Sequence, residues 1–350
     1  MNTIVFTGGG TAGHVMPNLA LIPRLAGTFE NVSYIGSAGG MEENIVKSRG
    51  VKFYAVSAAK LRRKPTLKNL KIPADVVRGI RQAKAVLKEL RPAVVFSKGG
   101  YVAVPVVFAA RSLKIPVVTH ESDLTPGLAN RIIAPRAEKV LTAFAETAKD
   151  FPNGEYVGLP LSDELFSTDR AAALARYRLG GKPVLLVLGG SQGSRALNEC
   201  LAGALENLLP RFDVLHLCGK NNRPVSSAAG YTCVPFESEM CYAYAAADVA
   251  LTRAGAGTLF ELLALGVPSV AVPLPAGASR GDQVQNAEYF ASRGLITLLY
   301  EKNLTPASLE AAVSSAYADR FNARRRLAAL DLKGAGDRVA KILAAYAEGR

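Results

Sequence analysis

The chain has 350 residues, of which 49% are hydrophobic and 20% charged, and its 42 basic and 29 acidic residues give a net charge of +13. This length exceeds that of one typical core and predicts two α/β domains of roughly 150–180 residues in an ordinary soluble globular protein. The basic excess favours nucleic acid, an anionic membrane or phosphorylated ligands as partners.

Several other classes of protein are excluded. The first predicted strand begins within a few residues of Met1, so no secretory signal is expected. The apolar run 262–278 is interrupted by glycine and prolines, which predicts helix, strand and loop instead of a transmembrane helix. Four cysteines without Cys-x-x-Cys spacing are expected to be buried thiols of a cytosolic protein, and three dispersed histidines predict no metal site: Cys200, Cys218, Cys233, Cys241, His14, His120 and His216. No cofactor is expected.

Apolar runs alternate with helical patterns along the whole chain. In the first half they predict strands at 3–7, 32–35, 53–56, 94–96 and 116–119, a last strand at 140–141, and helices at 18–25, 76–90 and 102–111. The polar stretch 156–178 is interpreted as a linker with a short helix. In the second half the same alternation predicts strands at 183–188, 214–217, 232–234, 249–251 and 269–272, a helix at 195–208 and an amphipathic tail helix at 337–346. We therefore expect domains at 1–160 and 161–335, with 336–350 as a separate C-terminal helix.

Two strand–glycine-loop–helix units carry the most information about function. Gly8-Gly9-Gly10-Thr11-Ala12-Gly13-His14 follows the first strand, and Gly189-Gly190-Ser191-Gln192-Gly193-Ser194 follows the first strand of the second half. A glycine-rich turn that opens a helix directs backbone N–H groups and the positive end of the helix dipole at an anion. One such loop is weak evidence, but two predict paired domains that face a cleft, as in a nucleotide-sugar enzyme more than in a dehydrogenase.

A third segment, Arg253-Ala254-Gly255-Ala256-Gly257-Thr258-Leu259-Phe260-Glu261, also follows a strand and opens a helix. Ala256, Gly257 and Thr258 can offer N–H groups to a phosphate, and the Glu261 carboxylate can accept the two hydroxyls of a ribose. The alternative is a helix first turn with a dipole-compensating glutamate. The segment around Gln283 follows a Pro/Gly loop and can line a cleft, or it is only a helix cap.

These motifs, together with Gly99-Gly100-Tyr101-Val102 and His120-Glu121-Ser122-Asp123, occur in the order seen in the MurG family of bacterial glycosyltransferases. The chain resembles this family over nearly its whole length. The resemblance implies a B-type glycosyltransferase fold: two doubly wound Rossmann-like α/β domains, the N-terminal one for the acceptor and the C-terminal one for UDP-GlcNAc, with a tail helix that crosses back to the first. It also implies transfer of GlcNAc to the 4-hydroxyl of MurNAc in undecaprenyl-diphosphate-MurNAc-pentapeptide, with inversion, at the cytoplasmic side of the cell membrane.

The resemblance also implies roles for individual residues. His14 and Glu121 are the candidate catalytic residues, and Gly9, Gly10, Gly99, Gly100 and Tyr101 are assigned to the acceptor diphosphate. The residues assigned to UDP-GlcNAc are Thr11, Ala12, Gly13, Asp123, Ser162, Ser191, Arg253, Ala256, Gly257, Thr258, Leu259, Phe260, Glu261 and Gln283. Ser162 stands where the family usually has arginine, so either another cation, such as Arg253 or Arg280, supplies that charge or donor affinity is weaker.

The chemistry of sugar transfer agrees with these residue types. A departing UDP needs stabilisation, which loop amides and helix dipoles supply, and the incoming hydroxyl needs a base. His14 fits the base because an unperturbed histidine titrates near neutral pH, although a loop histidine that only packs the turn is the alternative. His120 and His216 are interpreted as structural residues.

The basic charge is concentrated between residues 60 and 91. In the segment 60–72, cations interleave with Leu61, Leu67, Leu70 and Ile72, which suits insertion at an anionic membrane interface. The alternative is a solvated basic face. The following helix is expected to bury Val76, Val77, Ile80, Ala83, Leu87 and Leu90. No stacking aromatics accompany the cations, so nucleic acid is not an expected partner.

Other cell-wall synthesis proteins are further candidate partners. A UDP-GlcNAc 2-epimerase and a non-catalytic nucleotide-binding membrane adaptor remain alternative functions.

Overall fold

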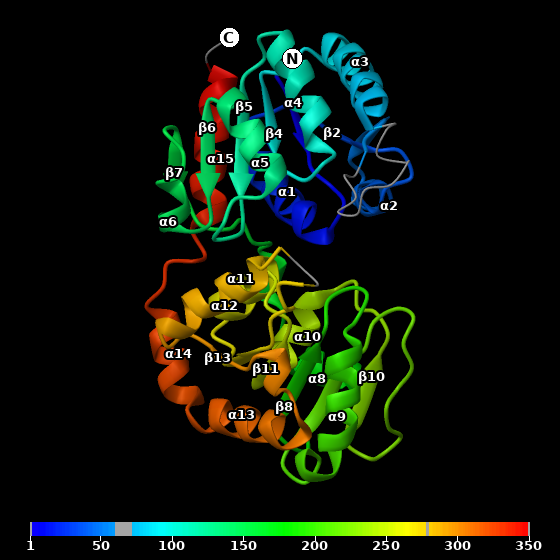
Figure 1. Cartoon of the computed structure of the whole chain (residues 1–350), viewed down its shortest axis with the longest axis vertical. Helices are drawn as coiled ribbons and strands as arrows, with labels where there is room; N and C mark the ends of the chain where they lie inside the picture. Colours follow the sequence, from blue (N-terminus) through cyan, green and yellow to red (C-terminus); the bar gives the residue numbers. More distant parts are fainter. Residues whose placement is uncertain (1, 60–71, 278–279, 349–350) are drawn as a thin grey trace. The chain divides into compact units, whose positions relative to one another are not determined.

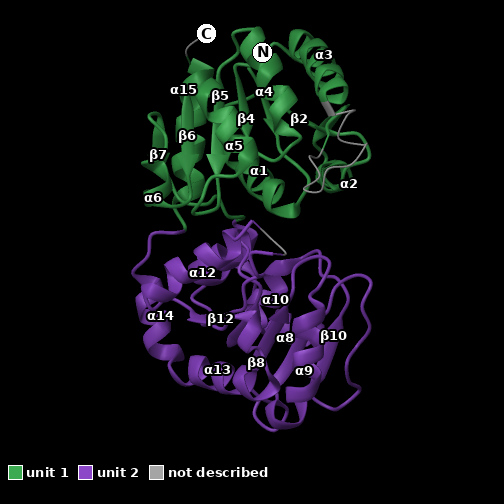
Figure 2. Cartoon of the chain, viewed as in Figure 1, with its two compact units in different colours: residues 1–162, 333–350 green, residues 163–332 purple. Residues whose placement is uncertain are grey.

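The computed structural model describes residues 2–59, 72–277 and 280–348, and the chain divides into two compact units (Figures 1 and 2). Unit 1 comprises residues 1–162 and 333–350, and unit 2 comprises residues 163–332. Each unit is built on a parallel sheet with helices on both faces, so the fold is α/β, as the sequence predicts.

The sheet of unit 1 has the strand order β3-β2-β1-β4-β5-β6-β7, and every pair in it is parallel. Its strands are β1 (Thr3–Thr7), β2 (Asn31–Ser37), β3 (Lys52–Val56), β4 (Val94–Ser97), β5 (Val117–Glu121), β6 (Lys139–Thr142) and β7 (Gly154–Tyr156). The central strands bury both faces, which is why they are continuous apolar runs.

Helices cover the two faces of this sheet, and alternate strand residues contact opposite layers. Ile4 and Phe6 of β1 pack toward α1 and α15, whereas Val5 packs toward α3 and α4. The helical segments are η1 (Ala12–His14), α1 (Met16–Leu21), η2 (Pro23–Leu25), α2 (Met41–Ser48), α3 (Ile72–Leu90), α4 (Ala103–Ser112), α5 (Leu128–Ile133), η4 (Ala134–Arg136), α6 (Ala145–Ala148) and α15 (Ala335–Glu348).

Helix α15 belongs to unit 1 although all of unit 2 precedes it in the chain. Val339 and Leu343 are fully buried in the core beside β1 and β4, and Ile342 and Tyr346 pack against the same core. Asp337 forms an ion pair with Arg24 of η2 at 3.1 Å. The helix is therefore held by one apolar face, which is the amphipathic pattern seen in the sequence.

The sheet of unit 2 is parallel with the order β10-β9-β8-β11-β12-β13. Its strands are β8 (Val184–Leu188), β9 (Asp213–Leu217), β10 (Tyr231–Val234), β11 (Val249–Thr252), β12 (Ser269–Ala271) and β13 (Thr297–Leu298). The helical segments are α7 (Glu164–Ser167), α8 (Arg170–Tyr177), α9 (Arg195–Leu208), α10 (Met240–Ala246), α11 (Ala256–Ala264), α12 (Asp282–Ser292), η5 (Glu301–Asn303), α13 (Pro306–Ala318) and α14 (Arg320–Ala328).

Local sequence determines where the two helices on one face of this sheet begin and which of their residues face the core. Ser194 caps α9 by accepting the N–H of Leu197, and the apolar residues of α9 recur at helical spacing toward β8 and β9. Helix α13 starts with a capping box between Thr305 and Ser308, and it packs beside α9 on the same core. The opposite face of β8 contacts α10.

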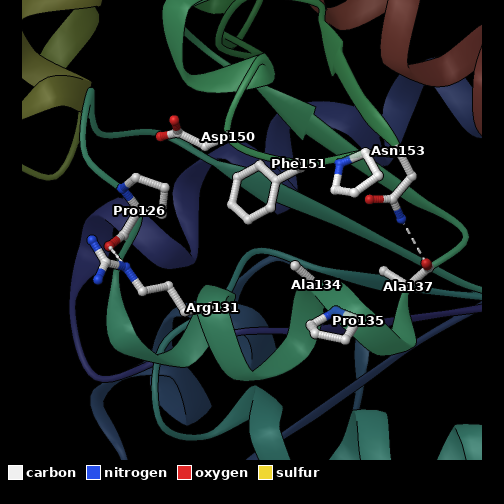
Figure 3. A pocket seen from close by; sticks show the side chains of 9 residues that line it. Pro126, Arg131, Ala134, Pro135, Ala137, Asp150, Phe151 and Asn153 are labelled. Carbon is white, nitrogen blue, oxygen red and sulfur yellow. Dashed lines mark hydrogen bonds between the residues drawn. The ribbon is translucent and has the colours of Figure 1, made fainter.

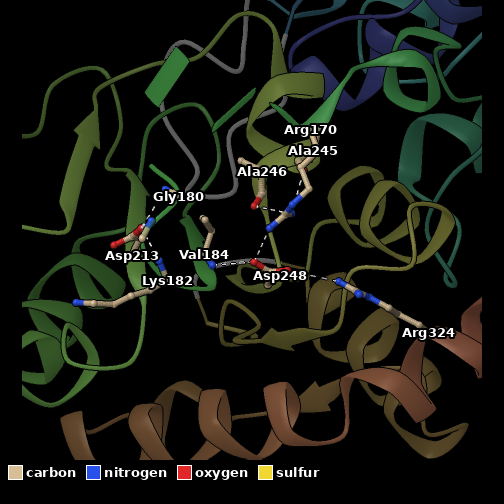
Figure 4. A network of polar contacts seen from close by, with 10 residues as sticks. Arg170, Gly180, Lys182, Val184, Asp213, Ala245, Ala246, Asp248 and Arg324 are labelled. Carbon is tan, nitrogen blue, oxygen red and sulfur yellow. Dashed lines mark hydrogen bonds and ion pairs between the residues drawn. The ribbon is translucent and has the colours of Figure 1, made fainter. Parts of the chain in front are cut away.

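Two aspartates, the buried Asp213 and the partly buried Asp248, close the amino-terminal edge of the sheet in unit 2 (Figure 4). Asp248 accepts the N–H of Val184 at 2.9 Å and pairs with Arg170 at 2.7 Å and Arg324 at 3.7 Å. Asp213 accepts the N–H groups of three consecutive residues, Gly180, Gly181 and Lys182. Both carboxylates hold loops at the edge opposite the carboxyl ends of the strands, so we assign them to the architecture.

In each sheet the strand order reverses at one point, between β1 and β4 in unit 1 and between β8 and β11 in unit 2. In doubly wound sheets, ligands bind outside the carboxyl ends of the strands at such a switch point. The first glycine loop follows β1, the second follows β8, and the segment 253–261 follows β11. All three sequence motifs therefore lie at switch points.

Some local predictions were wrong. The strand at 139–142 is not the last of its half, because β7 pairs with β6. The predicted helix 18–25 is α1 followed by the separate 3-10 turn η2. Val77 is 47% exposed, whereas Ala83 and Leu87 of the same helix are buried. Cys233 is only partly buried, unlike the other three cysteines.

The predicted membrane-binding segment 60–72 falls almost entirely outside the described residues. Within the described residues, no helix is both long and apolar enough to cross a membrane.

Candidate functional site

The first glycine loop is built around an internal carboxylate. Glu42 of α2 is fully buried, and its Oε2 accepts the Gly10 N–H at 3.3 Å while its Oε1 accepts the Ser37 N–H at 2.9 Å. Gly10 has a φ of +87°, a conformation that glycine adopts without strain. An anion that uses the Gly10 amide therefore competes with Glu42 for it.

The segment Gly99-Gly100-Tyr101 at the end of β4 packs directly on this loop. A Cβ atom at Gly100 would lie 2.5 Å from the Gly9 carbonyl oxygen, and one at Gly10 would lie 2.7 Å from the Tyr101 ring. Only glycine fits at these two positions, because a side chain there would overlap the neighbouring loop. The structure thus brings together all five residues that the sequence assigned to the acceptor diphosphate.

His14 ends the same loop, and its Nδ1 lies 3.1 Å from the Gly9 carbonyl oxygen and 3.0 Å from Thr11 Oγ1. A carbonyl oxygen only accepts hydrogen bonds, so Nδ1 carries the proton in the neutral ring and Nε2 carries the lone pair. The side chain is half-buried, whereas Thr11 and Gly13 are exposed. Ala12 is not among the described non-glycine residues with positive φ, so alanine fits this position without strain.

Glu121, the second catalytic candidate, holds a turn. Its Oε1 accepts the backbone N–H groups of Ser122 at 2.8 Å and Asp123 at 3.0 Å. Its Oε2 accepts the backbone N–H of Gly127 at 2.8 Å and the side-chain Nδ2–H of Asn130 at 2.9 Å. The residue is only 5% exposed. A carboxylate with both oxygens occupied by N–H donors is suited to fixing the chain between β5 and α5.

The two other histidines are structural, as the sequence predicts. His120 is fully buried, and its Nε2 lies 2.8 Å from the Gly158 carbonyl oxygen. Burial and the nearby Lys98 charge hold the pKa of His120 well below its usual value. His216 is bound between Tyr231 and Asn198, and burial lowers its pKa to about 4.

A pocket of about 530 Å³ lies at the switch point of unit 2. Helix α11 begins beside it at Ala256, and its N-cap, Gly255, has no side chain to satisfy the first N–H groups of the helix. The helix end therefore presents the amides of Ala256, Gly257 and Thr258 to an anion. The pocket is lined by Gly189, Gly190, Gly193, Ser194, Arg195, Ala196, Glu199, Thr252, Arg253, Gly255, Thr258, Leu274, Gln283 and Glu301.

Arg253 supplies a fixed cation in this pocket. Its Nε donates to Ser194 Oγ at 3.0 Å, its Nη1 donates to the Val272 carbonyl oxygen at 3.2 Å, and its Nη2 forms an ion pair with Glu301. The side chain is only 8% exposed. Arg280, the other cation considered for the role of the missing arginine, is exposed and pairs with Asp282 at 3.7 Å.

Glu261 lies in the second turn of α11 and accepts the Tyr244 O–H at 2.6 Å. Burial raises the pKa of Glu261 to about 7, an effect that the Tyr244 hydrogen bond opposes. Both protonation states are therefore populated at neutral pH. Only the carboxylate can accept two ribose hydroxyls at once.

Gln283 lines the same pocket, and its Oε1 accepts the Leu274 N–H at 3.0 Å. With the carbonyl oxygen engaged in this way, the side-chain NH₂ is the group that can donate to a sugar hydroxyl. The hydrogen bond also joins the first turn of α12 to the loop after β12, which closes one side of the pocket.

Several predicted donor residues lie elsewhere. Leu259 and Phe260 have buried side chains, and Phe260 packs edge-to-face on Phe290. Their side chains therefore pack α11 into the core of unit 2. Ser191 is exposed on the second glycine loop and is not among the described residues that line the pocket. Thr11, Ala12, Gly13, Asp123 and Ser162 belong to unit 1, whereas the pocket belongs to unit 2.

The sequence prediction did not include Glu42, Lys98, Ser194 or Glu301. For Lys98 the signal was a charged residue two positions after the fully apolar run 94–96. Glu42 and Glu301 carry no local signal, because their roles depend on contacts with distant residues, Gly10 and Arg253.

Unit 1 also contains a hollow of about 700 Å³ (Figure 3). It lies along α5 and the loop before β7, with Arg131 and Asp150 as its charged residues. None of the predicted site residues lines it. Across the described ranges, no group of three or more His, Cys, Asp or Glu side chains is placed to hold a metal ion.

Comparison with known proteins identifies the relatives of this chain. Residues 4–142 match the glycosyltransferase family 28 N-terminal domain, and residues 184–340 match the family 28 C-terminal domain. The UDP-N-acetylglucosamine–N-acetylmuramyl-(pentapeptide) pyrophosphoryl-undecaprenol N-acetylglucosamine transferase of Lachnospira eligens is 45% identical, covering 91% of this chain and 92% of that protein. The protein of the same description from Lachnoclostridium phytofermentans is 43% identical, covering 100% and 99%.

Solved structures agree with the fold. The crystal structure of Acinetobacter baumannii MurG is 28% identical with a TM-score of 0.73, covering 98% of this chain and 99% of that one. A UDP-GlcNAc 2-epimerase from Neisseria meningitidis is only 13% identical with a TM-score of 0.64, covering 98% and 99%, and this likeness concerns the fold alone.

Proposed function

Because the chain belongs to glycosyltransferase family 28, with both domains of that family and relatives that share 43–45% identity, we infer that it is a hexosyltransferase that moves GlcNAc from UDP-GlcNAc to MurNAc-pentapeptide pyrophosphoryl-undecaprenol. The product is the disaccharide lipid precursor of peptidoglycan. The observation that carries the donor assignment is the switch-point pocket of unit 2, with a helix N-terminus, a buried arginine and a glutamine around one cavity.

The residues that line this pocket, together with those of the adjoining helix α11, match the chemical needs of a sugar diphosphate. The α11 amides and the Arg253 guanidinium face the diphosphate, where negative charge grows as UDP departs. The Glu261 carboxylate, in the second turn of α11 and not among the described residues that line the pocket, accepts the ribose hydroxyls. The Gln283 amide donates to the GlcNAc hydroxyls. Arg253 fills the role of the family arginine that Ser162 replaces, since it lines the pocket and Arg280 is exposed.

In the proposed transfer step, the 4-hydroxyl oxygen of MurNAc attacks the anomeric carbon of GlcNAc and the bond from that carbon to the UDP oxygen breaks, with inversion. His14 accepts the hydroxyl proton on Nε2, and the bond pair leaves with UDP. Glu121 holds the turn after β5 instead of taking the proton, because its two oxygens already accept four N–H groups. The Gly9–Gly10 and Gly99–Tyr101 segments bind the acceptor diphosphate.

The acceptor carries a polyprenyl chain, so the proposal includes peripheral binding at the cytoplasmic face of the cell membrane. The basic and apolar segment 60–72 supports it, since such a composition suits anionic lipid.

The direct test is transfer of radiolabelled GlcNAc from UDP-GlcNAc to a short-chain polyprenyl-diphosphate-MurNAc-peptide, with UDP release measured in parallel. Label in the lipid product with equal release of UDP is expected. Conversion of UDP-GlcNAc to its 2-epimer without an acceptor would instead assign the chain to the epimerases, and nucleotide binding without turnover would make it an adaptor.

A further inference from the structure

Unit 1 contains a lysine that is buried beside the first glycine loop. Lys98 follows β4 directly, is 1% exposed, and donates its backbone N–H to the Thr7 carbonyl oxygen at 2.9 Å. Its Nζ donates to Ser122 Oγ, in the turn that Glu121 holds. Lysine is almost never fully buried in proteins unless it is paired, so this position calls for an explanation.

The charges around Lys98 come from several elements. His120 and Glu121 of β5 and Asp123 of the following turn face it, and both carboxylates favour the ammonium form. On the side of β1, its Cβ packs on Gly8, and the charged or titratable groups of that loop are His14 and, beneath Gly9 and Gly10, Glu42. Tyr101, in the segment between β4 and α4, packs its ring on Gly10 of the same loop.

Burial of the ammonium group has a cost in stability. Desolvation lowers the pKa of Lys98 to about 8, although the two carboxylates oppose this effect. In the unfolded chain a lysine titrates near pH 10.4, so between these two values the unfolded state binds more protons and stability rises with pH. At neutral pH the charged Lys98 therefore lowers the stability of the fold. A buried lysine that lowers stability in this way is better explained by function than by stability.

We propose that Lys98 is a positioning residue for the glycosyl acceptor: its buried ammonium group holds Ser122, and through it the turn 121–127, beside the first glycine loop. Lys98 does not touch the substrate, because it is buried. It fixes the turn that begins at Glu121 and includes Asp123 and Gly127. This inference rests on the proposed function only for the identity of the acceptor.

The test compares Lys98→Met, which keeps the length of the side chain and removes the charge, with Ser122→Ala, which removes the contact from the other side. Lys149→Met is the matched control, because Lys149 is an exposed lysine of the same unit. Initial rates give kcat and KM for donor and acceptor from pH 6.5 to 9.5. Thermal unfolding and amide hydrogen exchange of residues 121–127 are measured on the same proteins.

For Lys98→Met and Ser122→Ala we expect the KM for the acceptor to rise about tenfold or more, with the KM for UDP-GlcNAc within about twofold of the parent. In the parent, kcat/KM for the acceptor should fall above about pH 8, where Lys98 loses its proton, and this decline should vanish in Lys98→Met. The melting temperature of Lys98→Met at pH 7 should not fall, and the amides of the turn should exchange faster.

Parental acceptor kinetics in a folded Lys98→Met protein would overturn the proposal, as would unchanged exchange in the turn. If Lys98→Met does not fold, Ser122→Ala decides by the same two measurements. If the parent itself transfers no GlcNAc, the proposed function fails, while hydrogen exchange still decides whether Lys98 holds the turn.

Discussion

At the residue scale, a backbone carbonyl determines which nitrogen of His14, the proposed base, can accept a proton. The Gly9 carbonyl oxygen binds Nδ1–H, which leaves the lone pair on Nε2. The segment after β4 also lies close to this ring, since a Cβ atom at Gly100 would lie 3.2 Å from Nδ1. Geometry of this kind supports proton transfer without requiring the ring to bind either substrate tightly.

We therefore predict that His14→Asn lowers turnover by about 10²–10⁴-fold, the usual contribution of a general base, while UDP-GlcNAc affinity stays near that of the parent. Asparagine keeps a hydrogen bond to the loop but cannot take the proton. Steady-state turnover and calorimetric donor binding on the same folded protein test this. Near-normal turnover would make His14 a loop residue and contradict its role as the base.

Glu261 gives a prediction about pH. Its pKa lies near 7, so the carboxylate that we propose to accept the ribose hydroxyls is lost as the pH falls through this value. The KM for UDP-GlcNAc should rise between pH 8 and pH 6. In Glu261→Gln it should be more than tenfold higher than in the parent at pH 8 and nearly independent of pH, since hydrogen bonds to a charged group contribute about 1.5–3 kcal/mol.

The stability of Glu261→Gln serves as its control. The folded-state pKa of Glu261, about 7, is higher than the value of about 4.3 in an unfolded chain. Stability therefore falls as the pH rises from about 4.3 to about 7, and the ionised carboxylate lowers it at higher pH. At pH 8 the melting temperature of Glu261→Gln should therefore not fall. A donor KM equal to that of the parent in the folded variant would contradict the ribose assignment.

At the element scale, local patterns predicted what local forces determine. The ranges of β1 and α9 match the predicted ones because an apolar run and a capped amphipathic stretch specify them. The short strands β7 and β13 were missed, because three or two residues carry no period and form only by pairing with β6 and β12. Val77 was misassigned because helical spacing near the start of α3 does not show which residues the sheet covers.

The residues of the candidate site likewise fall into those that a local pattern predicts and those that depend on distant contacts. Glycine loops, the α11 start and His14 were recognisable because their chemistry is contained in consecutive residues. The contacts Lys98–Ser122, Arg253–Glu301 and Gly10–Glu42 join residues that are 24, 48 and 32 positions apart, and only the strand order brings them together. A sequence pattern also does not show that a glutamate such as Glu121 is already saturated with N–H donors.

Helix α15 provides an element-scale prediction. Leu343→Ala removes a fully buried side chain from the core of unit 1 and should lower the free energy of unfolding by about 2–5 kcal/mol. Lys341→Ala on the exposed side of the same helix is the control and should cost less than about 0.5 kcal/mol. Chemical denaturation followed by circular dichroism measures both. Equal stability of the two variants would mean that α15 does not complete this core in solution.

At the scale of the whole molecule, the net charge of +13 and the segment 60–72 predict salt-sensitive binding to anionic vesicles. Screening limits the reach of exposed charges to about 8 Å at physiological salt, so binding should fall steeply as salt rises. Replacing Arg62, Arg63 and Lys64 with glutamine should weaken co-sedimentation, each cation contributing roughly 1 kcal/mol. Neutral vesicles are the control, and equal sedimentation of variant and parent at low salt would make the segment a solvated basic face.

The placement of α15 at the end of the chain also affects the order in which the two units can fold during synthesis. A ribosome that has synthesised residues 1–162 has produced every strand of the first sheet, but not Val339 and Leu343, which cover Ile4, Phe6 and Phe96 on one face. The nascent chain carries that apolar face covered only in part, by residues such as Leu21 and Leu25, while the whole of residues 163–332 is translated, and exposed apolar surface of this kind favours aggregation. Unit 2 can thus mature first, and we expect ribosome-bound chains that lack α15 to recruit chaperones more strongly than chains that contain it.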